Sequence, residues 1–126
     1  MRKPGLTGRY SITVAPRHTA DAMGNPGVHV LATPWLVHFC QSAAVDAISG
    51  TLDAGEVSVP LRSTLAHHAA APIGALVVAV AELVEADADR LVFSVQAAHG
   101  ERIVMSGTHE REVVGRAAYL AQASAA

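Results

Sequence analysis

The fold is decided by the stretch TPWLVHFCQSAAVDAISG, which runs from Thr33 to Gly50. Threonine can cap a helix N-terminus, and Pro34 is tolerated at the first helical position, where no backbone N–H is needed. Gly50 suits the left-handed residue that follows a last helical turn. Between them the helix is apolar on nearly every side, which is typical of a helix buried by other elements. We therefore predict one long helix that begins at Thr33 and is wrapped by the rest of the chain.

The segments around this helix predict β-strands. Before it, Tyr10–Val14 alternates with period two and is rich in β-branched residues. Between the two lies Pro16–Pro26, which we interpret as a loop with at most one irregular helical turn at Ala20–Met23. The Ala-rich end from Gly115 predicts a short helix. Four further strands are predicted after the long helix, at Val57–Leu65, Leu76–Val84, Leu91–Ala98 and Arg102–Val114.

This order of elements predicts an α+β fold. One strand, one long helix and four antiparallel strands form a hotdog fold, in which a single curved sheet wraps one buried helix. The 126 residues leave room for one domain, 1–126. The core is built mainly from Ala and Val, and only 4% of residues are aromatic, so burying a face against a second copy would add packing. Pairing would also cover a free sheet edge, and we therefore expect a homodimer or a higher assembly.

Composition and charge exclude several classes of protein. Hydrophobic residues make up 51% of the chain and charged residues 16%, which excludes a disordered chain. The net charge is −2 and the basic residues are scattered, so nucleic acid is not expected as a partner. The longest apolar run, Ala75–Ala81, is too short to cross a membrane. Cys40 has no partner for a disulfide and the first residues do not resemble a signal peptide, so we expect a cytoplasmic protein.

The start of the long helix is the first candidate site. Backbone N–H groups there lack partners and lie at the positive end of the helix dipole, so they suit a carbonyl oxygen that gains negative charge. The candidate donors are the N–H or hydroxyl of Thr33 and the N–H of Trp35, because Pro34 has no N–H. Gln41 is a polar side chain on an apolar helix, and burying it unpaired would cost about 1–3 kcal/mol. The alternatives are a plain N-cap at Thr33 and a hydrogen bond from Gln41 to the sheet or to a partner subunit.

Two adjacent histidines end the second predicted strand. Alternation places His67 on the face of Val59, Leu61 and Leu65, toward the helix, and His68 on the opposite face. Only His67 is then a candidate catalyst, and the alternative is a core histidine with satisfied hydrogen bonds. A metal site is not expected, because adjacent histidines in a strand point apart and no His-Glu-x-x-His or Cys-x-x-Cys spacing is present.

The last predicted strand contains the third candidate, SGTHER at 106–111. Its polar residues fall on both faces, and Gly107 permits a close backbone approach, which indicates an interface or a ligand edge. The alternative is an edge strand protected by charge. The chain has no Gly-rich phosphate loop and no Gly-x-Ser-x-Gly elbow, so nucleotide-binding and serine-hydrolase functions have no support.

Together these segments resemble the fluoroacetyl-CoA thioesterase family of hotdog proteins. The similarity runs from about Gly8 to Val114. It is carried by VLATP at 30–34, the eight-residue step to Gln41, HHAAAPIG at 67–74, the strand 77–83 and SGTHER at 106–111.

The resemblance implies hydrolysis of acyl-CoA thioesters. It assigns catalytic roles to Thr33, Gln41 and His67, and it places Arg111 near the acyl group or coenzyme A; Trp35 is a further candidate substrate-binding residue. It implies neither a metal nor a cofactor, apart from the coenzyme A that belongs to the substrate. We expect Thr33 and the helix start to polarise the thioester, Gln41 to hold water or the acyl carbonyl, and His67 to act as general base.

Two departures from the family pattern limit the prediction. The family has a glutamate where this chain has Gln41, and an amide can be neither general base nor nucleophile. The segment Asn25–His29 lacks the phenylalanines that close over a small acyl group, so fluoroacetate specificity is not expected. In a straight helix Thr33 and Gln41 are about 12 Å apart, which requires Thr33 to lie in the lead-in. A non-catalytic acyl-thioester or apolar-ligand module is the alternative, and a hydratase is disfavoured because it also needs a carboxylate.

Overall fold

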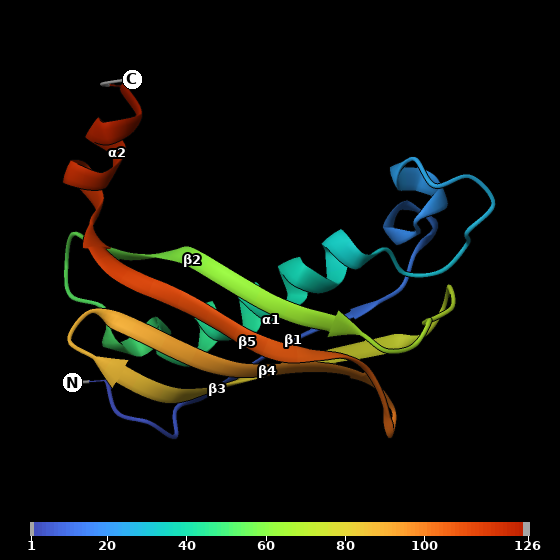
Figure 1. Cartoon of the computed structure of the whole chain (residues 1–126), viewed down its shortest axis with the longest axis horizontal. Coiled ribbons are helices and arrows are strands. Elements are labelled where there is room, and N and C mark those ends of the chain that lie inside the picture. The colour runs from blue at the N-terminus through green and yellow to red at the C-terminus, as the bar shows by residue number, and fades with distance from the viewer. Residues whose placement is uncertain (1, 125–126) are drawn as a thin grey trace.

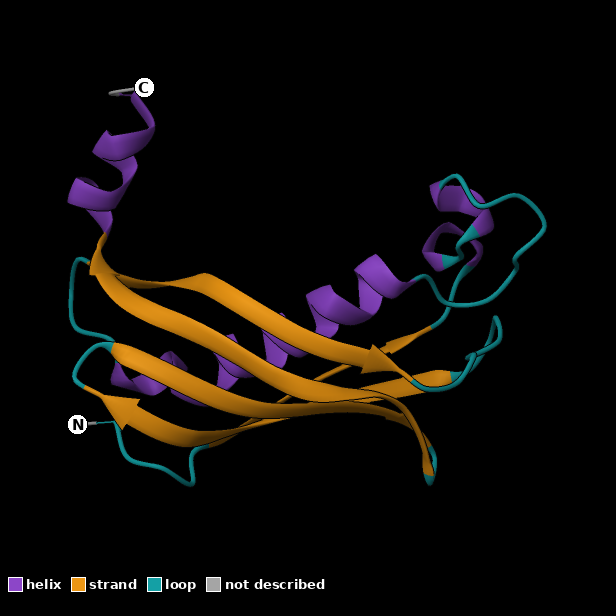
Figure 2. Cartoon of the chain, in the orientation of Figure 1, coloured by secondary structure: helices purple, strands orange, loops and turns teal. Residues whose placement is uncertain are grey.

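One long helix lies against one face of a curved, five-stranded antiparallel sheet (Figures 1 and 2). The structure is a computed structural model that describes residues 2–124. The strand order is β1-β3-β4-β5-β2, so β1 and β2 form the two edges. The strands are β1 (Thr7–Thr13), β2 (Glu56–His67), β3 (Leu76–Asp87), β4 (Arg90–His99) and β5 (Arg102–Gly115). This arrangement confirms the predicted hotdog fold.

The helices differ in detail from the prediction. The long helix α1 spans Thr33–Ile48, and a 3₁₀ turn η3 (Ser49–Thr51) continues it, so Gly50 does not take the predicted left-handed conformation. The loop before α1 contains two short 3₁₀ turns, η1 (Pro16–His18) and η2 (Asp21–Met23), where one turn was expected. The predicted C-terminal helix is α2 (Arg116–Ser124), which projects from the end of β5 (Figure 1). The last predicted residues, 125 and 126, lie outside the described part of the chain.

The core lies between α1 and the inner face of the sheet. Leu36, Phe39 and Ile48 on the helix are at most 1% exposed, as are Leu83 and Phe93 on the sheet. The opposite side of α1 is open to solvent in a single chain, where Val45 is 41% exposed. The prediction of a helix buried on all sides is therefore wrong for the isolated chain.

Small residues let α1 approach the sheet closely. The helix packs mainly on β1 and β3. A Cβ atom at Gly8 would overlap the carbonyl oxygen of Ala43 and the backbone nitrogen of Ala47. Helix and strand are therefore in contact through their backbones at this point, and the position of α1 on the sheet is closely constrained.

A bulge in β2 changes which residues face the helix. The pairing of β2 with β5 shifts between Pro60 and Arg62. Val59 pairs with Glu112 and His67 with Met105, seven residues away on β5, so Val59 and His67 face opposite sides of the sheet. The predicted common face of His67, Leu65 and Val59 therefore holds for Leu65 and is wrong for Val59, while Leu61 lies in the bulge and is 46% exposed.

The position of SGTHER in the sheet corrects one of the predicted alternatives. The strand that carries SGTHER is β5, which lies between β4 and β2, so the alternative of a charge-protected edge strand is wrong. The open edge next to it is β2.

Within residues 2–124, no helix is both long and apolar enough to cross a membrane.

Candidate functional site

The C-terminal end of β2 and the start of α1 bring two of the predicted site residues together. The hydroxyl oxygen of Thr33 lies 2.9 Å from Nδ1 of His67, although the two residues are 34 positions apart in the chain. Both side chains are exposed in the single chain. The contact forms because β2, an edge strand of the sheet, ends at the same end of the molecule at which α1 begins (Figure 1).

A second hydrogen bond determines which nitrogen of His67 carries the proton. Nε2 of His67 lies 2.9 Å from the carbonyl oxygen of Ala69. A carbonyl only accepts hydrogen bonds, so Nε2 of the neutral ring is protonated and Nδ1 accepts the Thr33 hydroxyl proton. A hydroxyl, a base and a group that orients the base are thus aligned, which is the arrangement that activates a hydroxyl for proton transfer.

The helix start itself differs from the predicted cap. The N-cap is Ala32, and Thr33 is the first helical residue, with no side-chain cap hydrogen bond. The N–H of Trp35 donates to the Ala32 carbonyl at 3.1 Å, and Pro34 has no N–H. Within residues 2–124 no acceptor is found for the N–H of Thr33. Of the three predicted donors, this N–H is the one left to stabilise a carbonyl oxygen.

His68 is separated from this site by strand alternation. Its Nε2 lies 2.7 Å from the hydroxyl oxygen of Ser106, on the face of the sheet opposite to His67. The prediction that only one of the two histidines faces the helix start is confirmed.

Gln41 does not reach the Thr33–His67 pair in the single chain. Because Thr33 is helical, the predicted lead-in position for it is wrong, and eight residues of helix separate the two by about 12 Å. Gln41 is half-buried and makes no hydrogen bond to Thr33 or His67 in the described structure. Within one chain, the amide and the start of the helix therefore lie too far apart to contact the same atom of a ligand.

Trp35 lies in an aromatic cluster on another side of α1. Its ring packs edge-on against His18 at a centroid distance of 4.7 Å and near Phe39 at 6.1 Å. The guanidinium of Arg17 lies 5.4 Å from the ring centroid. Two residues after Thr33, the helix has turned by about 200°, so Trp35 points away from the Thr33 side. Its substrate-binding role stays a prediction.

Arg111 is the centre of a buried polar network. It is 3% exposed, its Nε donates to the Ser58 hydroxyl at 2.9 Å, and its Nη2 donates to the Ser58 carbonyl at 2.9 Å. Nη1 lies 3.1 Å from Nε2 of His109, whose Nδ1 lies 2.6 Å from the Ser63 hydroxyl oxygen. Since an arginine only donates, His109 accepts at Nε2 and donates from Nδ1 to Ser63.

The same network explains two shifted pKa values. Burial and the neighbouring Arg111 charge lower the pKa of His109 to about 4, so this ring is neutral at pH 7. Burial also lowers the pKa of Arg111, which nevertheless stays charged at pH 7.

Burial raises the pKa of the Cys40 thiol to about 11, so Cys40 is protonated and not a nucleophile.

Comparison with known proteins identifies the family. The sequence profile of the fluoroacetyl-CoA-specific thioesterases matches residues 14–117, which is most of the chain. The chain belongs to the fluoroacetyl-CoA-specific thioesterase family. Over 85 residues it is 38% identical to the fluoroacetyl-CoA thioesterase of Streptantibioticus cattleyicolor, and the match spans 68% of this chain and 61% of that relative.

Solved structures agree with this family. The crystal structure of the fluoroacetyl-CoA thioesterase FlK superposes with a TM-score of 0.89 at 29% identity and covers 98% of this chain and 96% of that chain. A thioesterase superfamily member from Thermus thermophilus has the same fold, with a TM-score of 0.88 at 24% identity over 95% of this chain and 89% of that one.

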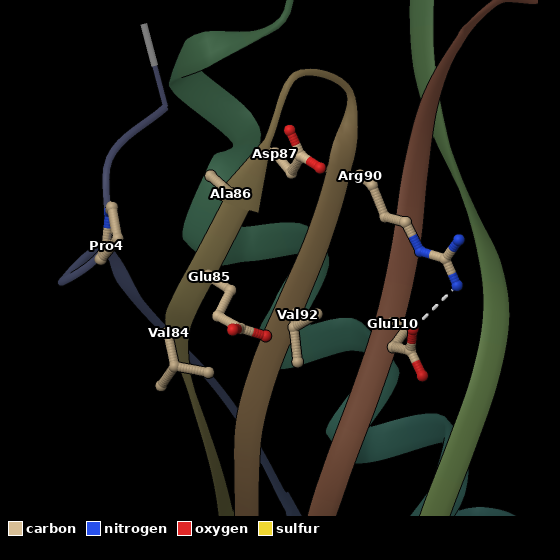
Figure 3. A pocket seen from close by; sticks show the side chains of 8 residues that line it. All are labelled: Pro4, Val84, Glu85, Ala86, Asp87, Arg90, Val92 and Glu110. Carbon is tan, nitrogen blue, oxygen red and sulfur yellow. Dashed lines mark hydrogen bonds and ion pairs between the residues drawn. The ribbon is translucent and has the colours of Figure 1, made fainter.

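A hollow on the outer face of the sheet does not resemble the Thr33–His67 site. Figure 3 shows the side chains that line a hollow on the face of the sheet turned away from α1. The volume of this hollow is about 580 Å³. Among its charged side chains, Arg90 and Glu110 form an ion pair at 3.1 Å, and the Arg90 side chain is open to solvent. Among residues 2–124, no three His, Cys, Asp or Glu side chains gather closely enough to bind a metal ion.

Sequence reasoning missed three members of the network around Arg111. His109 and Arg111 are two residues apart in β5 and therefore share a face, a spacing that the sequence displays. Their partners Ser58 and Ser63 lie on β2, on opposite sides of the bulge. No local signal in the sequence predicts that both serines face α1.

Proposed function

We propose that this protein hydrolyses acyl-CoA thioesters at the helix start of α1. The observation that carries the proposal is the alignment of the Thr33 hydroxyl, the His67 ring and the Ala69 carbonyl through two hydrogen bonds of 2.9 Å. Family membership supports the same reaction, as does the structure of an FlK variant in complex with acetyl-CoA.

The hydroxyl of Thr33 acts as the nucleophile in the proposed reaction. It donates its single proton to His67 and so cannot also donate to the thioester carbonyl. His67 Nδ1 takes this proton while Thr33 Oγ1 attacks the carbonyl carbon. The carbonyl oxygen gains negative charge beside the Thr33 N–H, at the positive end of α1.

The second half of the reaction restores the enzyme. When the carbon–sulfur bond breaks, the coenzyme A thiolate takes the proton from His67 and an acyl-threonine ester remains. A water molecule then gives a proton to His67 and attacks the ester. Thr33 Oγ1 recovers the proton from His67, and the free acid leaves.

Gln41 has a different role from that of a catalytic carboxylate. From its position about 12 Å along α1, its amide lines the acyl part of the ligand instead of the reacting carbonyl. Its neutral amide also supports the second candidate function, an acyl-thioester-binding protein without turnover.

A homodimer paired along β2 completes the proposed site. This edge strand is longer than β1, carries His67 at its end, and exposes the run from Pro60 to Thr64. Antiparallel pairing about the middle of β2 places Leu65 opposite the partner subunit's Ser58. The partner subunit's Arg111, which binds Ser58, then comes near His67 and contributes to substrate binding. A cytoplasmic location fits the single, buried free Cys40.

The test is the release of free coenzyme A thiol from a panel of acyl-CoA esters, with His67→Ala as the inactive control. Turnover that His67→Ala abolishes supports the enzyme. Binding of acyl-CoA by calorimetry without turnover, weakened by Gln41→Ala, supports the binding protein. Sedimentation that reports about 26 kDa, twice 13.0 kDa, or a multiple of this supports the assembly. A fully active monomer contradicts it.

A further inference from the structure

The interior of this protein carries a positive charge that forms no ion pair with an acidic side chain among residues 2–124. Arg111 is 3% exposed, and its three hydrogen bonds go to the Ser58 hydroxyl, the Ser58 carbonyl and the neutral ring of His109. All three acceptors are uncharged. A buried charge without a counter-charge is unfavourable by several kcal/mol, so a site of this kind favours binding of an anion.

Arg111 forms no ion pair with an acidic side chain within the described residues. The strand registers place one acid, Glu56, on the face toward α1, two residues from Ser58, and its Oε1 accepts a hydrogen bond from the backbone N–H of Asp53 at 2.9 Å. The one acid of α1, Asp46, is exposed and accepts a hydrogen bond from the backbone N–H of Arg9 on β1. On the same helix, the half-buried polar residue Gln41 is a neutral amide.

Arg111 also retains the donors that a carboxylate needs. A guanidinium has five N–H groups, and the three hydrogen bonds leave one on Nη1 and one on Nη2. Two such donors suit a bidentate contact with a carboxylate. Because the guanidinium lies beneath the sheet beside the Phe93–His109 ring pair, a small anionic group fits there better than a nucleotide phosphate.

The proposed dimer places this charge within reach of an acyl group. Within one chain, Arg111 is six residues along β5 from Met105, the partner of His67, or about 20 Å. Across the proposed β2 pairing, the partner subunit's Ser58 lies opposite Leu65, two residues from His67. Neighbouring strands lie about 4.8 Å apart, and each of the two residues adds about 3.3 Å along the strand. The backbone positions of His67 and the partner subunit's Ser58 are therefore about 8 Å apart. An acyl chain of four or five carbons is about 4–5 Å long, and it spans this distance together with a hydrogen-bond contact of about 3 Å at its terminal carboxylate.

We propose that Arg111 of the partner subunit binds a carboxylate at the far end of the acyl group. The preferred substrates are then coenzyme A thioesters of dicarboxylic acids with four or five carbons. Water cleaves the thioester to give the free dicarboxylate and the coenzyme A thiol. This inference rests on the proposed thioesterase function and its dimer, and it names the substrate class.

Matched substrate pairs test the inference on the wild-type protein. We compare kcat/KM for succinyl-CoA with butyryl-CoA and for glutaryl-CoA with pentanoyl-CoA, because each pair differs in the terminal group at equal chain length. A charge-assisted hydrogen-bond pair is expected to favour the carboxylate about 10- to 100-fold. Equal or greater kcat/KM for the neutral member of both pairs would overturn the inference, and it would show that the charge is balanced by the partner's own residues.

Substitution of Arg111 tests whether the preference for a terminal carboxylate comes from this residue. Arg111→Gln should abolish the preference for the carboxylate and change kcat/KM for butyryl-CoA much less. Arg90→Gln, which removes an exposed arginine from the outer face, is the matched control and should keep the preference. A preference that survives in folded Arg111→Gln contradicts the assignment. If Arg111→Gln does not fold, calorimetry decides on the wild type: glutarate should bind at least tenfold more tightly than its half-amide, and equal binding overturns the inference.

The outcomes separate the two proposals. Hydrolysis of neutral acyl-CoA esters without a carboxylate preference leaves the thioesterase function in place and removes the inference. If no ester is hydrolysed, the thioesterase function fails, and the glutarate calorimetry then supports or overturns the anion site independently.

Discussion

His67 and His68 are neighbours in the chain, yet their rings lie on opposite faces of β2. Nδ1 of His67 is 2.9 Å from the Thr33 hydroxyl, and Nε2 of His68 is 2.7 Å from the Ser106 hydroxyl. His67→Ala should therefore reduce acyl-CoA turnover by about 10²- to 10⁴-fold, as the loss of a general base does, while His68→Ala should retain most of it. Steady-state kinetics of the two variants check this, and equal effects would contradict the separation of faces.

Two substitutions at Thr33 distinguish a nucleophile from a binding group. Thr33→Ala removes the hydroxyl and should reduce kcat by at least about 10²-fold, whereas Thr33→Ser keeps a hydroxyl that His67 can activate and should retain more of it. Mass spectrometry of acid-quenched enzyme should show an acyl adduct on Thr33. Full activity of Thr33→Ala would mean that His67 activates water directly.

Gln41→Glu tests whether a carboxylate is missing from the site. The change is nearly isosteric and supplies a base, so a gain of about tenfold or more in hydrolysis, or about 1.4 kcal/mol, would show that the wild type lacks a usable carboxylate. If the partner's Arg111 binds substrate carboxylates, the carboxylate introduced by Gln41→Glu should also compete with them for that charge. Because Gln41 lies about 12 Å along α1 from Thr33, we expect little change for butyryl-CoA and a loss for glutaryl-CoA, measured as kcat/KM. A parallel change for both substrates would contradict this expectation.

Gly8→Ala should destabilise the fold. Its Cβ would overlap backbone atoms of Ala43 and Ala47, which cannot move away as a flexible side chain would. Overpacking of this kind costs about 1–3 kcal/mol, which urea denaturation can measure. Gly50→Ala is the control, because nothing lies within 4 Å of its Cβ position and its φ is not positive. Equal stability of the two variants would show that α1 can shift on the sheet.

Acid should weaken the fold through His109. The pKa of His109 is lowered from 6.5 to about 4 in the folded state, so the unfolded chain binds more protons between these values. Stability from this group is present above pH 6.5 and is lost as the pH falls toward 4, by about 3 kcal/mol in all. Unfolding free energies at pH 7 and pH 4.5 should differ less in His109→Gln than in the wild type. An unchanged difference would assign the acid sensitivity to other groups.

Local signals predicted the start of α1 but not the role of the Thr33 side chain there. The Thr33-Pro34 pair located the first turn of α1 because proline is tolerated there, where no hydrogen-bond donor is needed; the expected exclusion of Thr33 from the helix is wrong. The hydroxyl does not cap the helix because Thr33 is itself the first helical residue and the cap position falls on Ala32; it donates instead to His67, 34 residues away. Helix and strand propensities depend on residues that are neighbours in the chain. The contact between Thr33 and His67, in contrast, forms only when β2 and α1 pack together.

The faces of β2 could be predicted only in part. Strict alternation holds from Ser63 to His67 and fails at Leu61, where the bulge reverses it. For the same reason the contact of Ser58 with Arg111 was not predicted, although the polar residues of β5 were. The separation of about 12 Å between Thr33 and Gln41 was predictable because helix geometry does not depend on tertiary contacts.

The hydrogen bond from His67 Nε2 to the Ala69 carbonyl has a consequence for the speed of proton transfer. The imidazolium ring keeps its Nε2 proton, so this bond persists when Nδ1 gains a second proton. Ala69 is itself held by the Val104 carbonyl of β5, which accepts from the N–H groups of His68 and Ala69 at 2.7 and 3.4 Å. The ring can therefore alternate between its neutral and charged forms without turning, and the reorganisation energy of the step stays small.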